Sequence, residues 1–544
     1  MGSFKIFRLI ATLLLFSTII VSGTVLISRA LKKTEIEPLP ETVLSEKIRK
    51  QIETVNAPFQ ANWKALELVP APKADDLTLI RRLSLALTGA PPSLEEIRRL
   101  EALPANADPV QSFLSHLFQD ARYHQYFAER LTRVFVGVEQ GPFLVYRRRR
   151  LVNWVADELA ENRPYGSMVH RLIASQGVWT TNPEANFITA AVIQNGENRG
   201  PDETKLAART SRAFLGISLD CMQCHDDKFG DHWKQEHFHQ LAAFYSQAEM
   251  SVTGVRENRS KTYEVAFLGE AAQTTVHAAV PFQDENLPSH GDQRSRLAQW
   301  ITHRNNRTFA RATVNRTWAF LTGRPLHSPV DEIPLDGPFP AGMEELADFF
   351  IEENHNLQAL IRMIAASEPF QRDSRSADPS LPVTKDQESA WAAFPITPLR
   401  SEQVAGSVIQ ASSLHAIDQD AHLFSKIARF GETRDFVKRY GDQGEDEFAE
   451  ESGTIPQRLL LMNGKLVAER TNRKSFLNSS TRISNNSPSE KEALNAAFLS
   501  TLARYPSEHE EDHFLAQLFD VSKNERARSV EDIFWALINS TEFS

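Results

Sequence analysis

Residues 203–217 read ETKLAARTSRAFLGI, and the motif CMQCH follows at 221–225. Within the first stretch, Leu206, Thr210 and Phe214 recur at the four-residue step of one helical face, which predicts an amphipathic helix. A second apolar stripe, Phe238-Leu241-Ala242-Tyr245, follows the motif. The motif therefore stands between two predicted helices, and we expect these helices to form the walls of a pocket.

The spacing of Cys221, Cys224 and His225 is that of a c-type haem attachment motif. Each thiol can form a thioether with a haem vinyl group, and the adjacent imidazole can bind the iron from one face. The chain contains two cysteines in all, which excludes a disulfide framework across the fold. The motif thus predicts covalent haem c as the cofactor, with His225 as an axial iron ligand.

Other interpretations of the same residues stay open. The cysteines could form a redox dithiol, although a thioredoxin-type pair follows a strand and opens a helix. With nearby histidines they could bind zinc, which usually takes four ligands in structural sites. They could also have no chemical role.

The sixth iron ligand is not decided by the sequence. His232, His237 and His239 all follow the motif closely. His237 and His239 point to different faces of a predicted helix, so at most one of them can serve. A five-coordinate iron is also compatible with these residues.

An uncharged apolar stretch, Leu9–Ile27, lies between Arg8 and Arg29 near the N-terminus. A membrane-spanning helix needs about 20 apolar residues, whereas the apolar core of a signal peptide has about 7–15. The length therefore predicts an uncleaved anchor in the cell membrane, with a cleaved signal and secretion to the periplasm as the alternative. Because haem c is attached outside the cytoplasm, we expect the body on the extracytoplasmic, periplasmic side.

Hydrophobic periodicity predicts a mostly α fold. Helical patterns begin at Asp75 and resume at Arg294, and two runs rich in β-formers, 262–268 and 274–280, lie between them. We expect two helical domains joined by a small β segment and preceded by a transmembrane helix. The expected boundaries are 1–33 for the anchor or signal, 34–74 for a linker, 75–250 for the first helical domain, 251–290 for the β connector and 291–544 for the second helical domain.

Charge narrows the range of partners. The net charge is −10 and no basic domain is evident, so we expect no nucleic-acid partner. The run Arg147–Arg150 could clamp haem propionates or an acidic partner, or it could be a solvated helix start. No Ser-His-Asp order, phosphate-binding loop or dinucleotide fingerprint stands out, and the sequence assigns no catalytic residue.

The chain resembles the planctomycete-type secreted proteins that pair two domains of unknown function, DUF1549 and DUF1553. The first is also called planctomycete cytochrome c-like domain 2. The similarity rests on RRLSLALTGAPP at 81–92 and AFLG at 213–216 in the first half, and on VNRTW at 314–318 and SEQ at 401–403 in the second. It covers roughly residues 75–543 and implies a haem, but no settled reaction.

The chain departs from the family pattern directly after the motif. Relatives often continue as His-Asp-His-Pro-Phe, whereas this chain reads His225-Asp226-Asp227-Lys228-Phe229. The usual second histidine is Asp227 here, so any ligand or proton-relay role of that histidine is lost.

These observations predict a membrane-anchored extracytoplasmic haem c protein. We expect it to carry out electron transfer or another redox function with redox partner proteins. Two alternatives belong to other classes. The chain could be a haem-dependent oxidative enzyme acting on an envelope polymer, or a non-redox scaffold that uses the Cys/His motif structurally. An open iron site would favour the enzyme over electron transfer.

Overall fold

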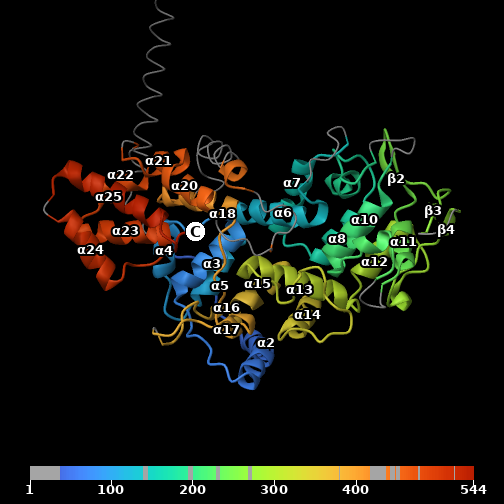
Figure 1. Ribbon diagram of the computed structural model, residues 1–544, viewed down its shortest axis with the longest axis horizontal. Coiled ribbons are helices and arrows are strands. Elements are labelled where there is room, and N and C mark those ends of the chain that lie inside the picture. The colour runs from blue at the N-terminus through green and yellow to red at the C-terminus, as the bar shows by residue number, and fades with distance from the viewer. Residues whose placement is uncertain are drawn as a thin grey trace, which may run out of the picture.

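The computed structural model describes residues 37–544, with the exception of 139–144, 194–199, 228–232, 268–271, 379, 417–435, 442–447, 449–453, 474, 476–477 and 520. Over these residues the chain is mostly helical and carries two small antiparallel sheets, as Figure 1 shows.

The elements before the strands are α2 (Glu46–Ala65), α3 (Asp76–Thr88), α4 (Leu94–Glu101), α5 (Pro109–Leu117), α6 (Ala121–Val136), α7 (Arg148–Ala160), α8 (Tyr165–Ile173), η1 (Pro183–Ala185), α9 (Asn186–Thr189), α10 (Glu203–Thr210), η2 (Ser211–Leu215), η3 (Asp220–Gln223) and α11 (Gln235–Ala243). The strands are β1 (Ala248–Ser251), β2 (Gly254–Glu257), β3 (Tyr263–Val265) and β4 (Thr274–Val276).

The elements after the strands are η4 (Asp284–Asn286), α12 (Gln293–Ile301), α13 (Arg307–Thr322), α14 (Met343–Glu352), α15 (Leu357–Ala366), α16 (Glu368–Gln371), α17 (Lys385–Ser389), α18 (Ser401–Ala411), α20 (Ile455–Asn463), α21 (Lys465–Thr471), α22 (Ser479–Asn486), α23 (Glu490–Leu502), α24 (Glu508–Leu518) and α25 (Lys523–Ile538).

Local signals in the sequence decide where the early helices begin and end. The carboxylate of Asp75 accepts a hydrogen bond from Thr78 N at 2.9 Å and so caps the start of α3. Gly89 ends α3 in the left-handed region at φ +70°, a conformation that costs glycine little. The predicted capping box is present at the start of α4, where Ser93 and Glu96 bond each other's backbone N–H groups.

The small β segment is confirmed where the sequence predicts strands. β3 pairs antiparallel with β4, and Tyr263 lies opposite Val276. The preceding hairpin of β1 and β2, which is joined at Val252-Thr253, was not predicted from the sequence. Those two residues are not the Asn-Gly or Asp-Gly pair that marks a tight hairpin, so no local signal pointed to it.

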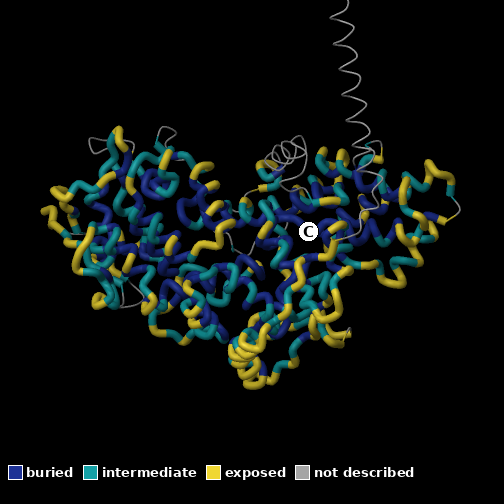
Figure 2. The backbone as a smooth tube through the Cα atoms, turned by 180° about the vertical axis from the view of Figure 1, so that it is seen from behind, coloured by how far each residue is buried: buried dark blue, intermediate teal, exposed yellow. Residues whose placement is uncertain are grey.

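Two large hydrophobic cores, with two small clusters beside them, hold the described chain together. The first takes its buried residues from Leu39 to Phe394, on both sides of the β segment. The second takes them from Val404 to Phe543. Helices α22 to α25 lie at the opposite end of the molecule from β3 and β4 (Figure 1), and buried backbone runs through both halves (Figure 2).

The predicted transmembrane helix is the part of the fold that must be corrected. In the described part of the chain, none of the helices combines the length and the apolar character that crossing a bilayer requires. Leu9–Ile27, where the sequence predicts that helix, lies outside the described residues. The predictions of a transmembrane helix and of single-pass localisation thus find no support in the described residues, whereas the membrane as a partner stays a prediction.

Arg294 of α12 is a buried clamp beneath the β segment. Its side chain is fully buried, and Nε lies 2.5 Å from Oε1 of Glu257 in β2. Nη1 donates to the carbonyl oxygens of Ile173 at 3.1 Å and Ser175 at 2.7 Å. One guanidinium therefore ties α12, β2 and the end of α8 together.

Replacing Arg294 with Met should lower the free energy of unfolding by about 3–5 kcal/mol, because Glu257 is left buried and unpaired. Chemical denaturation of the two proteins measures the difference. Gln299→Met, on the exposed side of the same helix, is the control and should change stability by no more than about 0.5 kcal/mol. Equal stability of the Arg294 variant and the wild type would show that the clamp is not needed.

We expect the protein to lose stability in acid because of His355, which lies between α14 and α15. The residue is 8% exposed, and its ring packs against Phe309 and Phe350. Burial lowers the pKa of this imidazole from 6.5 to about 4. Between these two values the unfolded chain binds more protons than the folded chain. Stability present above pH 6.5 should therefore be lost as the pH falls towards 4, by about 3 kcal/mol in total.

Unfolding midpoints measured between pH 8 and pH 4 would test this, with His355→Asn as the partner variant. Asn tolerates the positive φ of +59° at this position and does not titrate. The stability difference between the two proteins should shrink as the pH falls. A difference that is constant with pH would contradict the assignment to His355.

Candidate functional site

The Cys motif lies on a short turn between α10 and α11. Gly216, at φ +63°, ends η2, and a bridge between Ile217 and Glu332 follows it. Cys221 lies in η3, and Cys224 N donates to the Cys221 carbonyl at 3.2 Å. Both cysteines are free and exposed. The turn therefore presents two thiols at the surface, at either end of one hydrogen-bonded loop.

Helix α11 fixes this turn through hydrogen bonds. The Gln223 carbonyl accepts hydrogen bonds from Gln235 Nε2 at 3.1 Å and His239 Nε2 at 3.2 Å. Gln235 N donates to Asp226 Oδ1 at 2.7 Å. Met222 is buried between the two exposed cysteines. The backbone is thus fixed on both sides of Cys224, while the thiols stay accessible.

His239 and Tyr263 form a buried pair behind the turn. His239 Nδ1 lies 2.9 Å from Tyr263 Oη, in β3. Because the Gln223 carbonyl can only accept, His239 carries its hydrogen on Nε2, and Nδ1 accepts from the tyrosine hydroxyl. Burial lowers the pKa of the imidazole and raises the pKa of the phenol, so both groups stay neutral at pH 7.

The other predicted ligands are not gathered around an iron site. Nδ1 of the half-buried His225 is 2.7 Å from the Asp226 carbonyl. His237 accepts a hydrogen bond from Lys234 N at 3.2 Å, and its ring meets Trp233 edge-on. Both ring nitrogens of His239 are engaged, as described above, and His232 lies outside the described residues.

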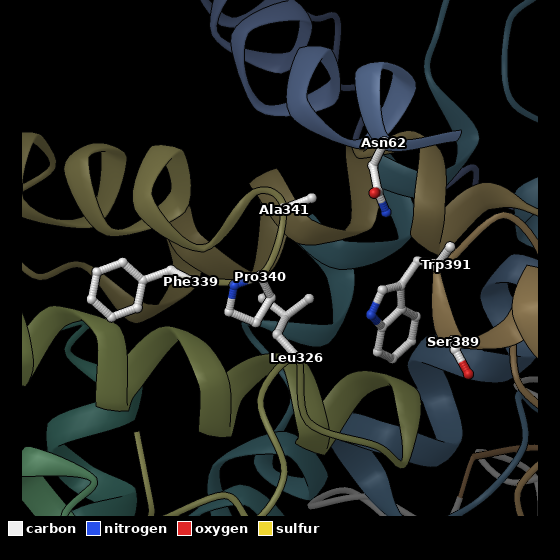
Figure 3. Close-up of a pocket in the computed structure, with 8 residues that line it drawn as sticks. Asn62, Leu326, Phe339, Pro340, Ala341, Ser389 and Trp391 are labelled. Carbon is white, nitrogen blue, oxygen red and sulfur yellow. The ribbon is translucent and has the colours of Figure 1, made fainter. Parts of the chain in front are cut away.

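Packing around the motif corrects the prediction of covalent haem c. The two helices that were expected to form pocket walls, α10 and α11, contact each other directly. Phe214, Phe238 and Tyr245 are fully buried there, and Tyr245 Oη lies 2.6 Å from Thr210 Oγ1. These buried side chains fill the contact between the two helices, so the expected pocket between them is not formed. Two cavities in the described part of the chain, one of them drawn in Figure 3, are lined by other residues and not by the Cys motif. The residues present do not fit a haem, so neither haem c nor His225 as an iron ligand is retained.

The arginine run at the start of α7 has a partly structural role. Arg148 donates to the Gly137 carbonyl and pairs with Glu129, both at 2.6 Å. Arg147 N donates to Asn186 Oδ1 at 2.7 Å. Arg149 and Arg150 are exposed. These contacts favour the helix-start interpretation.

Sequence reasoning missed a buried charged cluster at Glu96, His116, Asp120 and Arg122. Among the described residues it is the one group of three or more potential metal ligands within 4.8 Å of one another. The Arg122 guanidinium pairs with both carboxylates and occupies the position of a cation. Burial alone would raise the pKa of Glu96, but Arg122 and His116 outweigh it and hold that pKa well below its usual range. The cluster is a structural ion-pair network, and the capping box at Ser93 was its one sequence signal.

Family comparisons agree with this two-part helical architecture. The profile of PSCyt2, a protein of unknown function (DUF1549), matches residues 54–250, and that of PSD1, a protein of unknown function (DUF1553), matches residues 293–429. The protein is therefore a helical protein that combines these two domain types. It belongs to the DUF1549 and DUF1553 families, as its motifs predicted. No curated protein and no solved structure matches the chain.

Replacing Tyr263 with Phe removes the hydroxyl that His239 Nδ1 accepts from, and should lower the unfolding free energy by about 1–3 kcal/mol. Nitrogen-15 NMR of the histidine side chains should show hydrogen on Nε2 of His239 in the wild type. A wild-type ring carrying hydrogen on Nδ1 would contradict the assigned direction of both hydrogen bonds.

Proposed function

We propose that this chain is a redox protein whose reactive group is the Cys221–Cys224 pair, which cycles between a dithiol and a disulfide. One observation carries the proposal: two free, exposed thiols lie at the two ends of a single hydrogen-bonded turn. A redox role through these residues needs no further cofactor.

The turn suits an intramolecular disulfide. A hydrogen bond from residue i+3 to residue i holds the two Cα atoms within about 7 Å. A disulfide spans Cα separations of about 4.4–6.8 Å. Because Cys224 N donates to the Cys221 carbonyl, the turn brings the two Cα atoms close to the separation that a disulfide spans. The disulfide would close a ring without moving α11.

The chemistry is thiol–disulfide exchange with a partner disulfide. One cysteine thiolate attacks a partner sulfur and forms a mixed disulfide, and the first partner thiolate leaves. The second cysteine thiolate then attacks the cysteine sulfur of the mixed disulfide, and the second partner thiolate leaves. The pair loses two electrons and two protons, and the partner gains both as its own dithiol. The reverse sequence reduces the pair.

The geometry favours this chemistry over a metal centre. A Cys/His metal site would bring the Sγ atoms of Cys221 and Cys224 and a nitrogen of His225 together. These three residues do not form such a cluster, according to the ligand distances of the described chain. His225 instead directs Nδ1 at the Asp226 carbonyl. The thiols face solvent, where a partner can reach them.

Equilibration of the full chain in redox buffers of graded dithiothreitol ratio, followed by thiol labelling, tests the proposal. Because the chain has two cysteines, the labelled count should pass reversibly from two to none. The transition should follow a two-electron Nernst curve, and the oxidised protein should stay monomeric with the mass of an internal disulfide.

Cys224→Ser should retain one label at every buffer ratio that does not drive dimerisation. Met222→Leu, a swap of similar volume inside the turn, is the matched control and should titrate like the wild type. Two contrary results would reject the pair as the redox group. One is a wild type that keeps both labels under oxidising conditions, and the other is a metal ion that shields both thiols and is released by a chelator.

A further inference from the structure

Helix α20 has one exposed apolar face. Ile455, Leu459 and Met462 are exposed and are spaced by four and three residues, so they share one side of the helix. Trp535 of α25 adjoins them, because its Nε1 donates to the Met462 carbonyl at 3.3 Å while its indole is exposed. The opposite side of α20 is fixed by Leu461, which is buried in the second core. The four exposed side chains form what we name the α20 patch.

The α20 patch has the character of an interaction surface. Ile455 is 77% exposed and Leu459 is 52% exposed. Hydrophobic residues that are exposed singly are ordinary, whereas a contiguous apolar patch marks a surface that binds something. The Met462 carbonyl already accepts from the Trp535 indole. The exposed ring can therefore enter an apolar environment without leaving its N–H unpaired.

Long basic side chains lie beside the patch. Lys465 begins α21, three residues after Met462, and its ammonium is 3.6 Å from the Glu469 carboxylate. Arg528 lies two helical turns before Trp535 in α25, 4.0 Å from Asp532. Ion pairs as exposed as these two contribute little to folding. Their cations can therefore turn to lipid phosphates while their aliphatic stems stay on apolar surface.

The chain before the first described residue indicates what covers the patch. Leu9–Ile27 is uncharged and apolar, and such a stretch favours lipid over water. Residues 28–36 separate it from Glu37, a reach of at most about 30 Å when extended. Glu37 and Leu39 bond to Arg99 of α4, which contacts α23, and α23 contacts α25. Because packed helices lie about 8–10 Å apart, the apolar stretch and the α20 patch can meet the same lipid surface.

We propose that the α20 patch docks on the surface of a lipid bilayer, with Trp535 at the level of the headgroups. An amphipathic helix that lies in the interface buries its apolar face in this way without crossing the bilayer. Tryptophan is enriched at that depth, since its ring is apolar and its N–H is polar. Residues 442–453, directly before α20, carry six carboxylates. The attraction therefore comes from the apolar face and does not require anionic lipids.

Tryptophan fluorescence of the full chain in phosphatidylcholine vesicles, with and without brominated acyl chains, tests the proposal. Bromine quenches an indole only at close contact. All eight tryptophans lie in the described part of the chain, and Trp535 is the one that is exposed. Brominated vesicles should therefore quench the wild type, and Trp535→Phe should lose most of that quenching. Trp233→Phe, which removes a half-buried tryptophan near the Cys turn, is the control and should keep it.

Leu459→Glu should also lose most of the quenching, because its carboxylate would have to leave water for lipid. Leu66→Glu changes a leucine of matching exposure, 54% against 52%, and should be quenched like the wild type. Leu66 follows α2, on the side of the molecule away from α20 (Figure 1). Circular dichroism checks that both variants are folded.

Equal quenching of the wild type and Trp535→Phe, or no quenching of either, would overturn the proposal. So would a dimer of the full chain in detergent that Leu459→Glu dissociates, since a second copy would then cover the patch. Analytical ultracentrifugation detects that dimer. Neither result depends on the outcome of the thiol titration.

Discussion

Trp318 of α13 stacks on Phe59 of α2, at 5.7 Å between ring centroids, and meets Trp391 edge-on at 5.0 Å. This aromatic contact ties three segments that lie far apart in the sequence. It belongs to a hydrophobic core that draws residues from both domain families, between Leu39 and Phe394. The two families therefore share one packed unit in this chain.

The Cys turn is likewise held in place by segments that lie far apart in the sequence. Gly216 precedes the turn, and a Cβ at that position would lie 2.9 Å from Ile333 Cδ1. The Gly216 carbonyl accepts from Ile333 N at 2.9 Å. The segment before Cys221 is thus fastened to the second family segment, while α11 and Tyr263 fasten the segment after it. Contacts with distant parts of the chain thus fix the backbone of the turn, whereas the two thiols stay exposed to solvent.

Sequence patterns predicted those features that local chemistry controls. The helix start at Asp75, the capping box at Ser93 and the strand pair at Tyr263 follow from residue type and spacing, and the structure has them. Periodicity also identified the apolar faces at Phe214 and Phe238. It could not say what covers those faces, and the two helices close on each other where a pocket was expected.

The histidines show why the site itself was harder to predict. His237 and His239 are two residues apart, and sequence alone gives both the same chemistry. Burial separates them, because His239 lies beneath the turn and Tyr263, 24 residues later in the chain, supplies its hydrogen bond. Spacing alone therefore suggested ligands for a metal, whereas the tertiary contacts assign His239 a supporting role. The Glu96–Arg122 pair, 26 residues apart, was hidden for the same reason.

A turn supported in this way has a consequence for redox chemistry. The Gln223 carbonyl and the Asp226 carboxylate are held by α11 through hydrogen bonds in which neither thiol takes part. Closing a disulfide across the turn then orders little more than the Cys221 and Cys224 side chains. The conformational entropy lost on oxidation is correspondingly small, because ordering backbone costs about 1–2 kcal/mol per residue and most of that cost is met in folding. Loosening the support from His239 should therefore shift the pair towards the dithiol, since a mobile turn must be ordered when the ring closes.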